Sequence, residues 1–195
     1  CSDDITKNIT VNPQATASFT YNDNGNTNHC SPLVAGFTST VTNTETYQWE
    51  FGSYGASNLA NPSFTFTNDG TTDVIVPVTL STNNSFGCPA TFPQNITVRP
   101  SVKALFSLDK TAGCPPYNAN VSATTSAAII NYTWDFDGTA YTGSTQVFSN
   151  PSNLTGVDIT RNIKLTVSSG FCSDQTTKSI VVYPQVEAKY TALPL

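Results

Sequence analysis

Hydrophobic and polar residues alternate in short runs along most of the chain, and no segment sustains the 3.6-residue period of an amphipathic helix. The runs in the first hundred residues are ATASFTYN, PLVAGFTST, TYQWEF, PSFTFTN, DVIVPVTLST and NITVRP. Stretches such as NDNGNTN and NDGTT separate them, and their Gly, Asn and Asp residues tolerate turn geometry. The pattern predicts short β-strands joined by turns, and therefore an all-β fold.

The opening stretch of the chain recurs twice. CSDDITKNITVNPQATASFT (1–20) aligns without a gap with CPATFPQNITVRPSVKALFS (88–107) and with CSDQTTKSIVVYPQVEAKYT (172–191). HCSPLVAGF (29–37) matches GCPPYNANV (113–121), YQWEFG (47–52) matches YTWDFD (132–137), and all these starts lie 84 to 87 residues apart. We therefore predict two complete repeats flanked by partial ones. The predicted boundaries are 1–14 for the last strand of a preceding repeat, 15–100 and 101–185 for the complete repeats, and 186–195 for the first strand of a following repeat.

The cysteine at position 1 has two interpretations. A Cys-Ser-Asp-Asp start is typical of bacterial surface lipoproteins, whose first cysteine carries a lipid anchor. The repeat makes Cys1 the equivalent of Cys88 and Cys172. We prefer the second interpretation, in which the opening residues are the edge of a repeat.

Each repeat holds one tryptophan, in its third predicted strand. About 85 residues of short strands with such a tryptophan are typical of an immunoglobulin-like β-sandwich. Trp49 and Trp134 occupy matching places in TYQWEF and NYTWDF. We predict that both are buried core residues.

The order of motifs resembles one family more specifically. A-x-F-T, then [GH]-C-x-P, Y-x-W-[DE]-F, V-x-L-T-V and a final I-x-V-x-P resembles the PKD (polycystic kidney disease) domain, in the cysteine-bearing variety found in tandem arrays on Bacteroidetes surface proteins, including gliding-motility adhesins. The resemblance implies PKD-like sandwiches arranged end to end in an adhesin. The family's W-D-F-G-D-G turn is replaced by WEFGSYG (49–55) and WDFDGTA (134–140), which puts the calcium contact of some PKD domains in doubt.

Composition narrows the partners and the compartment. Charged residues make up 11% of the chain, the net charge is −5 and there is no basic run, so nothing marks a nucleic-acid or anionic-membrane surface. No stretch approaches the roughly 20 apolar residues of a membrane-spanning helix. Five cysteines suit an exported protein, because disulfides persist in oxidising compartments. We predict an extracellular, cell-surface location. We predict no glycan at the N-x-[ST] sequences of Asn8, Asn95, Asn131 and Asn153.

Candidate catalytic chemistry is sparse. The single histidine, His29, adjoins Cys30, but a catalytic pair would need an orienting group and a pocket. The second repeat has Gly113 in place of His29. We predict no enzymatic activity and no cofactor.

Asp135 and Asp137 are weak calcium candidates. Side chains two residues apart lie on the same face of a strand, but calcium takes six to eight oxygen ligands. The first repeat has Glu50 and Gly52 at the matching positions. We prefer solvated turn carboxylates to a metal site.

The cysteines precede either the second or the last predicted strand of a repeat. Bridges within repeats, Cys30–Cys88 and Cys114–Cys172, are the simplest pairing. However, alternating strand directions place the two loops at opposite ends of a sandwich, about 25 Å apart for strands of about eight residues, whereas bridged Cα atoms lie about 4.4–6.8 Å apart. A bridge between neighbouring repeats, Cys30–Cys172, removes this conflict and is our first choice. Bridges within repeats and fully reduced thiols remain alternatives.

The predicted function is non-enzymatic. We expect a segment of a repetitive cell-surface adhesin, acting as a stalk or adhesive segment, with a role in gliding motility implied by the resemblance. Its expected partners are neighbouring repeats and a surface polysaccharide or other cell-surface ligand. The alternative is a set of spacer or polysaccharide-binding modules of a secreted hydrolase, for which Tyr54 and Tyr141 are the candidate sugar-stacking rings.

Overall fold

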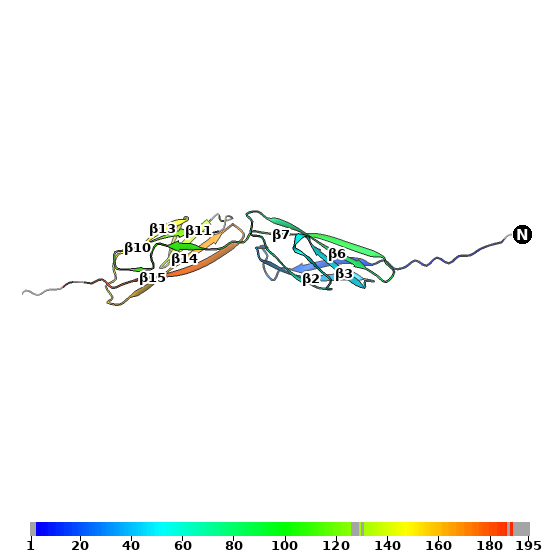
Figure 1. Cartoon of the computed structure of the whole chain (residues 1–195), viewed down its shortest axis with the longest axis horizontal. Coiled ribbons are helices and arrows are strands. Elements are labelled where there is room, and N and C mark those ends of the chain that lie inside the picture. The colour runs from blue at the N-terminus through cyan, green and yellow to red at the C-terminus, as the bar shows by residue number, and fades with distance from the viewer. Residues whose placement is uncertain (1–2, 126–128, 130, 187, 189–195) are drawn as a thin grey trace, which may run out of the picture. The chain divides into compact units, whose positions relative to one another are not determined.

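The computed structural model describes residues 3–125, 129, 131–186 and 188 (Figure 1). The chain divides into two compact units, Cys1–Arg99 (unit 1) and Pro100–Leu195 (unit 2). Within the described residues the only helical element is the short 3₁₀ helix η1 (Gly52–Tyr54), and none of their helices could span a membrane. The all-β prediction is therefore confirmed.

Unit 1 is a sandwich of two antiparallel sheets, of order β1-β2-β5 and β4-β3-β6-β7. The strands of the first sheet are β1 (Thr16–Asn22), β2 (Leu33–Thr42) and β5 (Ser63–Phe66). Those of the second are β3 (Thr46–Phe51), β4 (Ala56–Ser57), β6 (Val74–Asn83) and β7 (Pro89–Val98). The hydrophobic core lies between the sheets, because both contribute buried side chains to one cluster.

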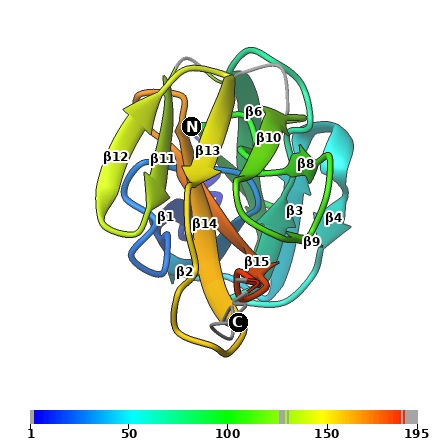
Figure 2. The same ribbon diagram turned by 90° about the vertical axis from the view of Figure 1, so that its left-hand side faces the viewer.

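Unit 2 repeats this arrangement with sheets of order β13-β10-β8 and β12-β11-β14-β15-β9 (Figure 2). The first contains β8 (Phe106–Leu108), β10 (Tyr117–Ala123) and β13 (Thr145–Asn150). The second contains β9 (Ala112–Gly113), β11 (Asn131–Phe136), β12 (Thr139–Thr142), β14 (Ile159–Ser168) and β15 (Ser173–Val182). Only the β9–β15 pairing is parallel among these named strands.

Alternation along the strands builds both cores, because successive side chains point to opposite faces. In β6 the buried residues are Val76, Val78 and Leu80, and in β14 they are Ile163, Leu165 and Val167. Trp49 and Trp134 are fully buried, and their indole N–H groups donate to the carbonyls of Leu59 (2.9 Å) and Gly143 (2.8 Å). The two tryptophans therefore have the same burial and the same type of hydrogen bond in the two units.

The turn after the tryptophan differs between the units. In unit 2 the hairpin β11–β12 has a two-residue loop, Asp137–Gly138, with φ of 51° and 80°. Positive φ at both positions is the geometry of a type I′ turn, for which Asp-Gly is a preferred sequence. In unit 1 the same region forms η1 and β4, which the alternating pattern did not predict.

The sequence analysis assigned 1–14 and 186–195 to strands of flanking repeats. Residues 3–15 lie in no helix or strand, and Ile5, Ile9 and Val11 are exposed. Most of 186–195 lies outside the described residues. The strands assigned there to a preceding and a following repeat stay predictions, because a strand forms only against a sheet partner.

Candidate functional site

A buried asparagine organises one end of each unit. The Asn68 amide donates to the carbonyls of Thr72 and Val98, both at 2.8 Å, and its backbone N–H donates to the hydroxyl of Ser31 at 2.8 Å. Asn153 donates in the same way to Val157 and Val182, both at 2.8 Å. These bonds hold the β5–β6 and β13–β14 loops against the end of the last strand. The sequence analysis missed both residues, and their spacing of 85 residues is the signal that could have found them.

The second-strand cysteines lie at this same end. Cys30 forms a parallel β-bridge with Arg99, whose backbone N–H donates to His29 at 2.9 Å. In unit 2 the N–H of Tyr183 donates to Gly113, the residue before Cys114, at 2.9 Å. We call this the C-terminal end of each unit, because the last strand finishes there.

The last-strand cysteines lie at the opposite, N-terminal end. The N–H of Cys88 donates to the side-chain oxygen of Asn84 at 2.9 Å, and that of Cys172 to the hydroxyl of Ser169 at 3.2 Å. The ten-residue strands β7 and β15 separate the two ends of their units, a distance of about 30 Å. The loop placement expected from alternating strand directions is therefore what each unit shows.

The oxidation states differ among the cysteines. Cys30 and Cys172 are disulfide-bonded, whereas Cys88 and Cys114 are free thiols. The pairings Cys30–Cys88 and Cys114–Cys172 do not fit this state, because each requires one of the free thiols. Cys1 lies outside the described residues.

His29, beside Cys30, contacts residues that stabilise the fold rather than a catalytic partner. Its ring nitrogen Nε2 lies 3.6 Å from the Asp23 carboxylate, and its carbonyl accepts the Arg99 bond described above. Because Cys30 is disulfide-bonded, it has no thiolate for His29 to activate. A Cys–His catalytic pair is absent at this position.

The calcium candidates in unit 2 face cations. Asp135 lies 3.7 Å from the ammonium of Lys164, its cross-strand partner, and Asp137 lies 3.1 Å from the guanidinium of Arg161. The Asp135 carboxylate also accepts the Gly138 N–H at 2.9 Å. No group of three or more His, Cys, Asp or Glu residues able to hold a metal occurs in the described part of the chain. Calcium would have to displace two cations here.

The candidate sugar-stacking tyrosines pack against the cores. Tyr54 contacts Phe66 edge-on at 5.4 Å and donates its hydroxyl to Thr67 at 2.5 Å. Tyr141 contacts Phe148 edge-on at 5.3 Å. Both rings are half-buried against a core phenylalanine, so their role in sugar stacking stays a hypothesis.

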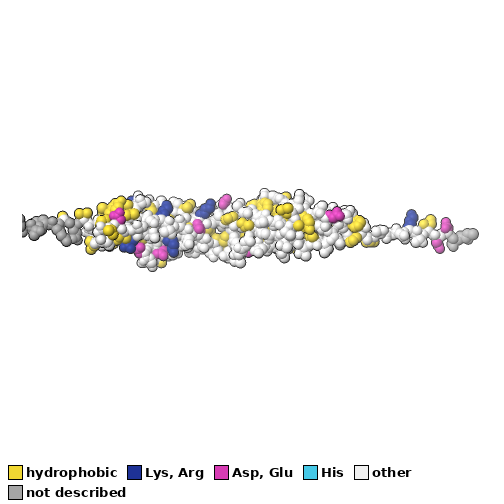
Figure 3. Space-filling view, turned by 90° about the horizontal axis from the view of Figure 1, so that it is seen from below, with side chains coloured by type: hydrophobic (Ala, Val, Ile, Leu, Met, Phe, Trp, Pro, Cys, Tyr) yellow, Lys and Arg dark blue, Asp and Glu magenta, His cyan; other side chains and the backbone are white. Residues whose placement is uncertain are grey.

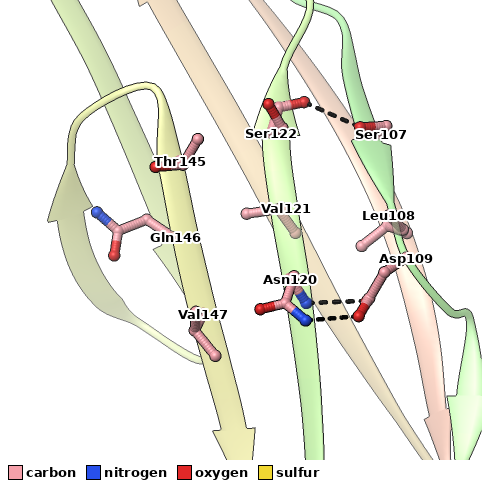
Figure 4. A pocket seen from close by; sticks show the side chains of 9 residues that line it. All are labelled: Ser107, Leu108, Asp109, Asn120, Val121, Ser122, Thr145, Gln146 and Val147. Atoms are coloured by element: carbon pink, nitrogen blue, oxygen red, sulfur yellow. Dashed lines mark hydrogen bonds between the residues drawn. The ribbon is translucent and has the colours of Figure 1, made fainter.

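On the face shown in Figure 3, uncharged polar side chains and backbone predominate, hydrophobic side chains form patches, and charged side chains are few and scattered. A cleft of about 710 Å³ lies on the outer face of the β13-β10-β8 sheet of unit 2. Figure 4 shows the residues that line it, which are Ser107, Leu108, Asp109, Asn120, Val121, Ser122, Thr145, Gln146 and Val147. We call it the unit 2 groove.

One polar pair dominates the unit 2 groove. The Asp109 carboxylate accepts the backbone N–H of Asn120 at 2.9 Å and its amide at 2.6 Å (Figure 4). The amide bond is the main cause of a lowered pKa at Asp109, because it stabilises the charged form. The lining contains one carboxylate and no His, Cys or Lys, so it can hydrogen-bond a ligand but holds no nucleophile–base pair.

Comparisons with known proteins leave the family open. No protein-family model matches the chain, and no curated protein sequence is similar to it. Among solved structures, the fibronectin(III)-like modules of Clostridium thermocellum CbhA match at 12% identity and a TM-score of 0.33, over 84% of this chain and 93% of that one. A tetra-tandem repeat from the extending region of a large adhesion protein matches at 14% identity and a TM-score of 0.32, over 87% of this chain and about half (49%) of that one. The PKD resemblance stays a prediction.

Proposed function

We propose that the two units are non-enzymatic modules of a repetitive cell-surface adhesin, and that they act as a stalk or adhesive segment that bears load. The gliding-motility context rests on the PKD resemblance. The extracellular location is supported by the bonded state of Cys30 and Cys172, since such bonds persist in oxidising compartments.

This proposal is supported mainly by the structural features that occur in both units. The buried tryptophan, the buried Asn68 or Asn153 and the cysteine at each end occur in both units. The unit 2 groove does not repeat, because Asn22 and Gly36 of unit 1 stand where the groove has Asp109 and Asn120. A groove that binds a ligand would be expected in each copy, whereas a stalk requires only that the buried tryptophan, the buried asparagine and the cysteines at the ends repeat.

A disulfide between Cys30 and Cys172 would link the two units covalently, so that pulling force passes through it from one unit to the other. In unit 1, Cys30 pairs with Arg99, the last residue of that unit. In unit 2, the carboxylate of Asp174 accepts the N–H of Ala104 at 2.8 Å, two residues beyond Cys172. We propose this pairing because Cys30 and Cys172 are disulfide-bonded, whereas Cys88 and Cys114 are free.

Single-molecule pulling from the two termini tests the proposal. The bridge encloses 142 residue steps, from 30 to 172, so unfolding both units of the oxidised chain should release about 500 Å less contour length than in the reduced chain. Non-reducing peptide mapping should recover a Cys30–Cys172 peptide. Equal contour lengths in both states, or unfolding without measurable force, would count against a load-bearing stalk.

A double variant, Cys30→Ser with Cys172→Ser, is the matched control. It should give the long contour length with or without reductant. The variant Cys88→Ser with Cys114→Ser should keep the difference between the two states, because these thiols are free.

Polysaccharide binding is the second candidate, and the unit 2 groove favours it. Asp109, Asn120 and Gln146 offer hydrogen-bonding groups on an open sheet face. Affinity electrophoresis against surface polysaccharides, with Asn120→Ala as the variant, tests it. Retardation that Asn120→Ala abolishes would support a binding module, and unchanged mobility on every glycan would remove this candidate.

A further inference from the structure

Residues 3–12, which we call the docking segment, expose large apolar side chains outside any strand. Figure 1 draws them without a strand arrow. Ile5, Ile9 and Val11 are 79%, 88% and 87% exposed. Ile9 and Val11 lie two residues apart, so an extended backbone places both side chains on one face. Apolar surface of this kind gains free energy when it is covered.

The same sequence is buried where it occurs again in the chain. Residues 8–11 read NITV, as do residues 95–98 of β7, whose isoleucine and valine are 0% exposed in the core of unit 1. In unit 2 the matching residues are Ile180 and Val182 of β15, at 0% and 1% exposed. The docking segment therefore has the sequence of a last strand, and both copies of that strand complete a sandwich.

The last-strand position is filled in both units. β7 pairs with β6, and β15 pairs with β14, along all ten of their residues. The docking segment therefore has no open position within units 1 and 2 as they are folded.

Reach also excludes an exchange with β7. The Asn84 amide donates to the carbonyl of Pro13 at 2.8 Å, which holds Pro13 at the N-terminal end of unit 1. A docking segment in place of β7 would bring Pro13 to the position of Pro100, at the C-terminal end. The two ends are about 30 Å apart, so the sandwich that the segment completes is a different one.

We propose that the docking segment adds, as the last strand, to a partner sandwich of this same repeat type whose last-strand position is open. It pairs antiparallel with the partner's counterpart of β6 or β14, so that main-chain hydrogen bonds supply affinity and alternate side chains supply specificity. Ile9 and Val11 enter the partner's core. This inference rests on the burial of the equivalent strands and does not require adhesive function.

Lys7 adds a requirement on the partner. It matches Lys178 of β15, whose ammonium donates to the carbonyl of Phe106 and lies 5.0 Å from the centre of that ring. Phe106 is on β8, the first strand of unit 2. The partner sandwich is therefore expected to carry an aromatic residue at this place on its own first strand.

An acceptor with an open position is obtained from this chain. Ending the chain after Phe171 removes β15, and Ile9→Asp with Val11→Asp prevents the acceptor from donating its own segment. The amide groups of β14 are paired with β15 in the intact chain, so their hydrogen exchange reports whether an added strand occupies the position. A synthetic peptide of residues 2–14, titrated into the acceptor in reductant, should protect β14 saturably.

Peptide variants separate strand addition from non-specific adhesion. Ile9→Asp should weaken binding about tenfold or more, because the isoleucine is buried at both equivalent positions. Asn8→Asp is the matched control. It adds the same charge at a position that is exposed in β7 and in β15, and it should bind like the parent peptide.

A full-length variant tests the same strand without truncation. Residues 1–11 and 172–182 differ at four positions, so Gln175→Asp, Thr176→Ile, Ser179→Asn and Val181→Thr give β15 the sequence of the opening stretch. The melting temperature of unit 2 should change by less than about 4 °C. Adding Ile180→Asp is the control and should lower it by about 10 °C or more.

The outcomes are distinguishable. Protection of β14 by the parent and Asn8→Asp peptides that Ile9→Asp weakens supports the proposal. Equal protection by all three peptides, no protection of a folded acceptor, or loss of unit 2 in the four-substitution variant overturns it. If the acceptor stays unfolded with every peptide, the melting temperature of the four-substitution variant decides. A shortened contour length in the pulling experiment together with equal protection by the three peptides would overturn this inference and leave the proposed stalk intact.

Discussion

Unit 1 and unit 2 share core residues on one sheet of the sandwich and differ in the core residues of the other sheet. Trp49 and Phe51 of unit 1 have direct counterparts in Trp134 and Phe136 of unit 2, on the third strand of each sandwich. On the opposite sheet, the register pairs Leu33 with Phe66 in unit 1 and Tyr117 with Asn150 in unit 2. The long four- or five-stranded sheet is therefore the constant part, and the three-stranded sheet adapts to it.

The ring contacts of the core differ between the units as a result. In unit 1, Phe37 on β2 lies between 5.1 and 6.4 Å from five other rings. Its counterpart in unit 2 is Val121. There Phe148 on β13 takes the central place, 4.9 to 6.1 Å from Phe136, Tyr141 and Trp134. The same sandwich is thus filled by two ring arrangements.

Truncating the central positions should give the largest difference between the units. We expect Phe37→Ala to cost unit 1 about 3 to 5 kcal/mol, and Val121→Ala to cost unit 2 about 2 kcal/mol, since less buried volume is removed. Equilibrium denaturation read by hydrogen exchange of peptides from each unit measures both losses. Phe148→Ala is the control and should cost unit 2 as much as Phe37→Ala costs unit 1. Equal losses for Phe37→Ala and Val121→Ala would show that Phe37 stabilises unit 1 no more than Val121 stabilises unit 2.

In contrast, the buried asparagines should contribute equally to the stability of the two units. Asn68→Ala and Asn153→Ala each leave the buried carbonyl at the end of the last strand without its donor, which costs about 2 to 3 kcal/mol. Urea denaturation of each variant measures the loss. Asn95→Ala, at an exposed position of β7, should stay within about 0.5 kcal/mol of the parent. A loss below 1 kcal/mol at Asn68 or Asn153 would mean that water replaces the amide.

The core residues on the sheets that contain β3 and β11 could be predicted from the sequence. Those on the sheets that contain β2 and β10 could not. Alternation and the repeated Y-x-W-[DE]-F motif indicate β3, β11 and their buried tryptophans, because both signals are local. The exchange of Phe66 for Asn150 depends on which residues face each other across β2–β5 and β10–β13, and a single strand does not contain that register. The prediction for the cysteine loops succeeded because it used only strand direction.

Short elements were missed for a related reason. β4 and β9 each hold two residues, and η1 holds three, so none is long enough for a period to emerge. β9 forms because its backbone pairs with the end of β15. A side chain at Gly113 would place its Cβ 2.5 Å from the Tyr117 ring, so glycine is needed there. That requirement follows from a contact within the fold, not from a local pattern.

A moderate effect is expected at Asn150, where unit 2 departs from unit 1. Asn150 is 7% exposed, and its amide nitrogen has no hydrogen-bond partner within the described residues. Asn150→Leu keeps the branching at Cγ and removes the unsatisfied amide, so unit 2 should gain about 1 to 2 kcal/mol. Thermal denaturation measures the gain. The reverse change in unit 1, Phe66→Asn, should destabilise that unit, and a loss of stability with Asn150→Leu would show that the amide binds an ordered water.

The smallest expected effect concerns the unit 2 groove, which unit 1 lacks. The Asn120 amide, the Asn120 and Lys110 backbone N–H groups and the nearby Lys110 charge all lower the pKa of Asp109. A lowered pKa in the folded state stabilises the unit at pH values above the ordinary aspartate range, and this contribution disappears as the pH falls through the folded pKa.

Asn120→Ala removes the largest of these causes, so the pKa of Asp109 should rise towards its ordinary value while the backbone bonds keep part of the shift. Carbon-detected NMR titration of the Asp109 carboxyl measures this, with Thr145→Ala in the same groove as the control that leaves the pKa unchanged. In unit 1, Asn22 and Gly36 take these positions, and neither residue has a carboxyl group in its side chain. An unchanged Asp109 pKa in Asn120→Ala would mean that the amide bond does not persist in solution, and the groove of unit 2 would then differ from unit 1 in shape alone.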